Sequence, residues 1–165
     1  MNTLNNNRLQ LNEVILEAPL PEWQLESIFG DDVPTVASLS DKPLLIMFFN
    51  LGCPGCLGRA VPYANRIVYE QGDVIRVIGI HSGYSSRKFD LTKFQKAKEE
   101  FYIRFLFYSD VNYDTTFLRY GAGGTPHWIL VDKEGIVRYS IFGSDPNNAL
   151  LRLEYVMREI LLEKG

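Results

Sequence analysis

The chain has two cysteines, and they lie three positions apart in Cys53-Pro54-Gly55-Cys56. An apolar run, residues 44–49, precedes the pair, and apolar residues at helical spacing follow it to about Glu70. The pattern predicts a buried strand that delivers both cysteines to the first turn of a helix. Because a thiol at a helix start has a lowered pKa, this placement is typical of a dithiol–disulfide redox centre.

Size and composition favour one domain over residues 1–165. The chain is 46% hydrophobic, which is enough for a full core without disulfide crosslinks. Its net charge is −3, and both signs of charge are mixed along the chain, so we expect no nucleic-acid partner. No apolar run approaches the roughly 18 residues of a membrane span, so we expect no membrane partner.

The first residues, Met1 to Arg8, lack the basic start and apolar stretch of a secretory signal, so we expect a cytoplasmic protein. In that reducing compartment, an isolated cysteine pair is more often catalytic, redox-sensing or metal-binding than structural. A zinc site would need further protein ligands, and only His81 and His127 could join the cysteines. We therefore expect neither a metal nor a cofactor.

Periodicity and turn residues predict the order of elements. We expect residues 1–8 to be disordered and residues 9–40 to form an N-terminal extension, with an edge strand in 9–17 and an irregular lead-in from 23 to 39. Further strands are predicted at 44–49, 74–80, 103–108, 127–131 and 136–142. Helices are predicted at 54–70 with a kink at Pro62, at 91–101 behind an Asp90 cap, at 114–120, and from an Asp145 cap onward. Strands separated by helices require parallel crossovers, and the late hairpin adds antiparallel strands, so the sheet should be mixed.

Three features coincide: the Cys53–Cys56 motif after a buried strand, Thr125-Pro126 before the next strand of the sheet, and a hairpin followed by a helix. With these the chain resembles the thioredoxin fold, and within it the TlpA-like thiol–disulfide oxidoreductases, which are related to the thiol-specific antioxidant group. The resemblance implies a three-layer α/β/α sandwich with a central mixed sheet, an N-terminal extension and an inserted helix-strand-helix segment at 90–120. It also implies a cis Thr125–Pro126 peptide that faces the cysteines and exposes the Thr125 backbone to substrate.

The chain also departs from its relatives. They usually carry Trp before the first cysteine, where this chain has Gly52, and often a buried acid that the strand 44–49 lacks. Their helix proline usually lies five residues after the second cysteine, whereas Pro62 lies six after Cys56.

The candidate site residues follow from this placement. Cys53 is the expected nucleophile, because at the helix N-cap its sulfur should lie near free backbone N–H groups and the positive end of the helix dipole. Cys56, one turn further in, should resolve the mixed disulfide. His127 is either a proton shuttle or a packed histidine, and packing is favoured for His81. The expected substrate surface consists of Gly52, Pro54, Gly55, Thr125 and Pro126.

The predicted function is reduction of protein or small-molecule disulfides, with a thioredoxin-reductase-type or thioredoxin electron donor. One alternative is a thiol peroxidase, although its Pro-x-x-x-Thr-x-x-Cys pattern places Ile46 and Asn50 where Pro and Thr are required. Another is a non-enzymatic redox-sensing or partner-binding module, which Gly52 and the missing buried acid would favour.

Overall fold

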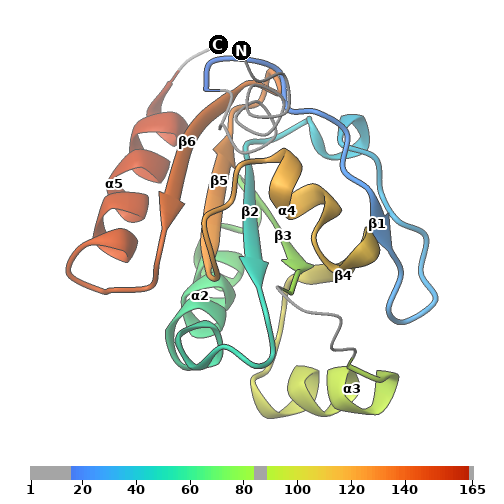
Figure 1. Ribbon diagram of the computed structural model, residues 1–165. Coiled ribbons are helices and arrows are strands. Elements are labelled where there is room, and N and C mark those ends of the chain that lie inside the picture. Colours follow the sequence, from blue (N-terminus) through green and yellow to red (C-terminus); the bar gives the residue numbers. More distant parts are fainter. Residues whose placement is uncertain (1–15, 84–88, 164–165) are drawn as a thin grey trace, which may run out of the picture.

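The protein contains one six-stranded mixed sheet. The computed structural model describes residues 16–83 and 89–163 (Figure 1). The strands lie in the order β1-β4-β3-β2-β5-β6, in which β2, β3 and β4 run parallel and each remaining neighbour pair is antiparallel. Their bounds are β1 (Leu25–Glu26), β2 (Leu44–Phe49), β3 (Arg76–His81), β4 (Leu106–Asp110), β5 (His127–Val131) and β6 (Val137–Phe142).

Helices cover both faces of this sheet, which confirms the predicted three-layer α/β/α sandwich (Figure 1). Helices α2 (Val61–Gln71), α3 (Leu91–Glu100) and α5 (Ala149–Leu162) pack on one face, and α4 (Thr115–Arg119) packs on the other together with the lead-in segment. Shorter 3-10 turns lie at Ala37–Leu39 and Val111–Tyr113. The segment α3-β4-α4 is the predicted insertion, and Asp90 caps α3 by accepting the Lys93 N–H.

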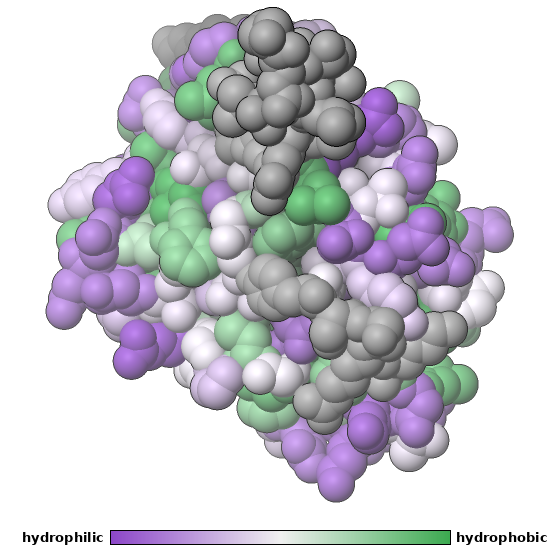
Figure 2. All heavy atoms as spheres, in the orientation of Figure 1, coloured by the Kyte–Doolittle hydropathy of each residue, from purple (hydrophilic) through white to green (hydrophobic). Residues whose placement is uncertain are grey.

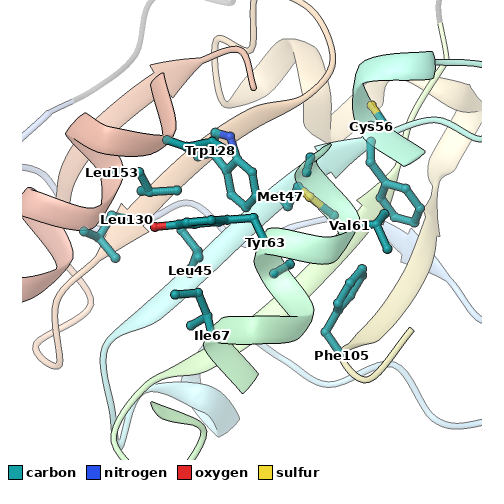
Figure 3. Packing of buried hydrophobic residues seen from close by; sticks show 14 of the residues in the cluster. Leu45, Met47, Cys56, Val61, Tyr63, Ile67, Phe105, Trp128, Leu130 and Leu153 are labelled. Carbon is teal, nitrogen blue, oxygen red and sulfur yellow. The ribbon is translucent and has the colours of Figure 1, made fainter. Parts of the chain in front are cut away.

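The central strand β2 is buried along its whole length, as its apolar sequence predicts. Side chains alternate along a strand, so Leu45 and Met47 face α2 and α5 while Ile46 and Phe48 face α4. Figure 3 shows Tyr63 reaching from α2 toward Leu130 and Leu153. Its ring meets Trp128 edge to face, with ring centroids 5.8 Å apart. This packing fixes α2, and with it the cysteines, against the sheet.

The helix that carries the cysteines departs from the prediction. Residues 54–55 are helical, Cys56–Ala60 forms a π-helical turn, and α2 begins only at Val61 with Pro62 in its first turn. Proline has no N–H to donate to the carbonyl four residues earlier, so the backbone widens before Pro62 instead of continuing as a regular α-helix.

Other boundaries also need correction. Helix α5 begins at Ala149, because Asp145 closes a separate turn: its carboxylate accepts the Asn147 N–H and its carbonyl accepts the Asn148 N–H. The predicted strand 103–108 lies later, at Leu106–Asp110. The lead-in contains β1, which at two residues is too short to produce a pattern.

Most of the N-terminal predictions, residues 1–15, fall outside the described residues. Where the description begins, Glu17 and Ala18 exchange backbone hydrogen bonds with Val137 at the start of β6. No helix among the described residues is long and apolar enough to cross a membrane. Figure 2 shows hydrophilic residues spread among smaller hydrophobic areas on the face that it presents, as expected from the mixed charges.

Candidate active site

Cys53 lies at the point where the loop after β2 becomes helical. Its carbonyl accepts the Leu57 N–H at 3.2 Å, and its Sγ accepts the Cys56 N–H at 3.2 Å. An acceptor at the N-cap that receives the third helical N–H is the usual capping geometry, here with sulfur in place of oxygen. Both cysteines are free thiols; Cys53 is half-buried and Cys56 is fully buried. Cys53 is therefore the more accessible residue of the pair.

The two thiols also differ electrostatically. Burial, and then the adjacent Cys53 thiol, raise the pKa of the Cys56 thiol far above its usual range. The Cys56 thiol therefore keeps its proton at neutral pH.

Thr125 and Pro126 lie beside the sulfur of Cys53. The Thr125–Pro126 peptide is cis, and the Cys53 thiol donates to the Thr125 carbonyl at 3.4 Å. Pro126 itself is buried, and its carbonyl accepts the Gly143 N–H at 2.9 Å. Trp128 Nε1 donates to the Gly143 carbonyl at 2.9 Å. The loop after β6 is thereby tied to the loop before β5, close to the thiols.

Gly55 of the motif and Gly52, which precedes it, have little room for a side chain. A Cβ at Gly55 would lie 3.0 Å from Ser144 Oγ, and one at Gly52 would lie 3.1 Å from Asn50 Oδ1. Gly52 and Pro54 are exposed, whereas Gly55 is half-buried against the loop after β6. Of the predicted substrate surface, Gly52 and Pro54 are exposed, Gly55 and Thr125 are half-buried, and Pro126 is buried.

Asn50 and His81 hold the loop that leads to Cys53. Asn50 Oδ1 accepts the Gly52 N–H at 2.8 Å, and its Nδ2 donates to the Ser82 carbonyl at 2.8 Å. His81 Nε2 accepts the Leu51 N–H at 3.0 Å. Burial lowers the pKa of His81 to about 4, so the ring is neutral and able to accept at neutral pH. The packed histidine favoured by the sequence thus also positions the loop.

His127 is not brought to the thiols by the structure. Its Nδ1 accepts the Gly123 N–H at 3.1 Å, and its Nε2 lies 2.6 Å from Ser140 Oγ. It follows Pro126 in sequence, but strand alternation places its side chain on the sheet face opposite that of Trp128, where α4 packs. Burial lowers the pKa of His127 to about 4. These contacts are those of a packed histidine and give no support to a proton shuttle.

A buried carboxylate, Asp110 at the end of β4, was missed by sequence reasoning. It accepts the Ser82 hydroxyl at 2.9 Å and the backbone N–H groups of Thr116 and Phe117 at 2.7 and 2.9 Å. Burial raises its pKa in spite of these donors. Ser82 links Asp110 to Asn50, because its hydroxyl bonds to the Asp110 carboxylate and its carbonyl accepts the Asn50 side-chain N–H. Asn50 and Asp110 both line a cavity of about 420 Å³. No sequence signal joins Asp110 to the motif, because only the pairing of β3 with β4 brings them together.

We compared the sequence and the fold of the chain with those of known proteins. No protein-family model and no curated protein matches the chain. Among solved structures, a thioredoxin-like superfamily protein is 26% identical with a TM-score of 0.78, over 90% of this chain and 99% of that one. A thiol–disulfide isomerase from Corynebacterium glutamicum is 26% identical with a TM-score of 0.78, over 89% and 98%. The exposed lipoprotein thioredoxin of Streptococcus pneumoniae is 20% identical with a TM-score of 0.65, over 82% and 99%.

The chain has a thioredoxin-like fold. Within this thioredoxin-like structure the cysteine motif lies at the carboxyl end of β2, which is where the order of strands and helices predicted it. The described residues contain no group of three or more His, Cys, Asp or Glu side chains arranged to hold a metal ion.

Proposed function

We propose that the protein is a thiol–disulfide oxidoreductase in which Cys53 is the nucleophile and Cys56 the resolving thiol. The observation that carries this proposal is the asymmetry of the pair: Cys53 is partly exposed and its Sγ accepts the Cys56 N–H at 3.2 Å, while the Cys56 thiol is buried and has a raised pKa. A helix N–H directed at Cys53 sulfur stabilises a thiolate there, which is the reactive form.

The reaction proceeds in two exchanges. The Cys53 thiolate attacks one sulfur of the substrate disulfide, which forms a mixed disulfide and releases the other substrate sulfur as a thiolate. Cys56 then gives up its proton, which the substrate thiolate released in the first exchange takes up, and attacks Cys53 Sγ; this closes the Cys53–Cys56 disulfide and releases the second substrate sulfur as a thiolate. The substrate gains two electrons and the protein dithiol loses them, so an external dithiol must reduce the protein again.

The surroundings of Cys53 support an extended substrate. Gly52 and Pro54 leave the approach to the sulfur open, and the Thr125 carbonyl at 3.4 Å offers a backbone acceptor to a chain that lies beside it. We propose net reduction in the cytoplasm, with a thioredoxin-reductase-type or thioredoxin donor, as expected from the sequence. The direction of the reaction and the choice of electron donor both depend on the reduction potential, because the fold is compatible with either direction of electron flow.

Two measurements test the proposal. Cys53→Ser should abolish disulfide reduction, whereas Cys56→Ser should accumulate the mixed disulfide with substrate, detected by non-reducing electrophoresis and mass spectrometry. Full turnover in the Cys56→Ser variant would refute the two-thiol mechanism. A potential near or below about −250 mV, measured by thiol trapping in dithiothreitol buffers, supports a reductase; one above about −200 mV overturns the reductive direction.

A further inference from the structure

A groove of about 420 Å³ separates the start of α2 from the start of α5. It is lined by side chains that include Arg59, Pro62, Tyr63, Arg66, Leu151 and Glu154. Pro62 and Leu151 are exposed apolar residues, and Tyr63 is buried with 8% of its surface exposed. The groove thus combines apolar walls with two guanidinium groups.

The charges in this groove are not balanced. Arg66 Nη2 lies 3.2 Å from Glu154 Oε1, and its Nε lies 3.8 Å from Glu70, so this cation is neutralised by its neighbours. Arg59 is exposed, and its side chain has no hydrogen bond or ion pair with any part of the chain between residues 16 and 83 or 89 and 163. One positive charge is therefore left for a ligand.

Tyr63 forms part of the floor of the same groove. Burial, and then the Glu154 carboxylate, raise the pKa of Tyr63 to about 12, while Arg66 opposes them, so the hydroxyl keeps its proton. The hydroxyl oxygen is itself buried, so Tyr63 adds neither a charge nor an accessible hydrogen-bonding group to the groove. The charge that a ligand meets there is therefore that of Arg59.

The loop between β6 and α5 connects the groove with the thiol site. At one end of this loop the Gly143 N–H donates to the Pro126 carbonyl, and Ser144 lies against Gly55 of the cysteine motif. Further along the same loop, Pro146 lines the groove. Arg59 follows Cys53 by six residues, which is roughly 9 Å along a helix at 1.5 Å per residue. An extended peptide advances about 3.3 Å per residue, so it covers this distance in about three residues.

We propose that the groove binds a carboxylate side chain of the disulfide substrate, carried on an extended peptide about three residues from the cysteine that Cys53 attacks. Arg59 supplies the charge, and Pro62 and Leu151 contact the apolar part of the peptide. The inference rests on the proposed oxidoreductase function and adds a substrate class to it, namely acidic peptide disulfides.

The test compares two disulfide-linked peptides that differ only by Glu or Gln at that position. At low ionic strength the wild-type protein should reduce the Glu peptide about three- to five-fold more efficiently in kcat/KM, the range of an exposed charge pair, and salt should remove the preference. Arg59→Glu should abolish or invert this ratio. The matched control Arg119→Glu, an exposed arginine of α4 on the opposite face, should leave the ratio as it is.

A wild-type ratio of one, or a ratio that Arg59→Glu leaves unchanged, would overturn the assignment. Failure of the proposed function gives a different result, in which neither peptide is reduced. In that event the groove is judged by binding alone, from chemical-shift changes of the Arg59 and Arg66 Nε–H signals when linear Glu and Gln peptides are added. Equal changes with both peptides would contradict the proposal, and larger changes with the Glu peptide would support it.

Discussion

Gly79 offers a sharp test of how the aromatic core below the thiol loop is packed. It lies in β3 between Met47 of β2 and Phe107 of β4. A Cβ added at this position would lie 2.7 Å from Phe105 Cε1, 3.0 Å from Phe107 Cβ and 3.0 Å from Phe49 Cε1. All three phenylalanines are buried, and their rings contact one another edge to face, so none can move without displacing the others.

The expected cost of Gly79→Ala follows from these distances. Overpacking a core by a methyl group costs about 1–3 kcal/mol, and three simultaneous close contacts place this substitution near the upper end. Loss of glycine's freedom in the unfolded chain offsets up to about 1 kcal/mol. The net decrease in the free energy of unfolding is therefore about 2 kcal/mol, which lowers Tm by about 4–8 °C for a chain of this size.

Urea unfolding of Gly79→Ala and Gly58→Ala provides the assay and its control. Gly58 lies in the π-helical turn, and a Cβ there has no atom within 4 Å. Gly58→Ala should therefore preserve stability or raise it by up to about 1 kcal/mol, since alanine favours helix. The m-value should stay unchanged in both variants. If Gly79→Ala were as stable as the wild type, or if both variants shifted equally, the reasoning from packing would be refuted.

Two further predictions concern the histidines and Trp128. His81 and His127 have folded pKa values of about 4, below the unfolded value of 6.5, so unfolding takes up protons. The free energy of unfolding should therefore be highest above pH 6.5 and fall as the pH drops toward 4, by roughly 3 kcal/mol per histidine. A urea midpoint that stays constant between pH 6.5 and 4 would contradict both pKa values. Trp128→Phe removes the donor to Gly143, and should lower stability by about 1–2 kcal/mol and reduce kcat/KM; unaltered unfolding and kinetics would show that this bond is unimportant.

Local sequence patterns sufficed for the strands and helices that bury one clear stripe or a whole element. The strand His127–Val131 was predicted at its observed bounds, because a continuous apolar run between a Gly-rich loop and a polar turn has one simple solution. Likewise, Asp90 caps α3 through a bond to Lys93, three residues away, and a contact of that range can be read from neighbouring residues. The two-residue strand β1 was missed, because its pairing partner on β4 lies more than eighty residues away.

In the candidate site, too, some features could be predicted from local sequence and others depended on strand pairing. Cys53 and Cys56 were predicted from spacing, because helix geometry alone determines that the first thiol caps the helix and the second lies one turn further in. The orientation of His127 was left open by the sequence. Only the pairing of β5 with β2 and β6 decided that its ring bonds to Ser140 and lies away from the sulfurs.

The amino-acid sequence by itself thus determined the alternation of strands and helices and the thiol pair at a helix start, since both depend on interactions within a few residues. Tertiary structure decided what surrounds that pair. The Thr125 carbonyl beside Cys53, Ser144 against Gly55, and the groove that Arg59 shares with α5 all arise from segments that are far apart in the chain. Their proximity depends on strand order and helix packing, which no local pattern encodes.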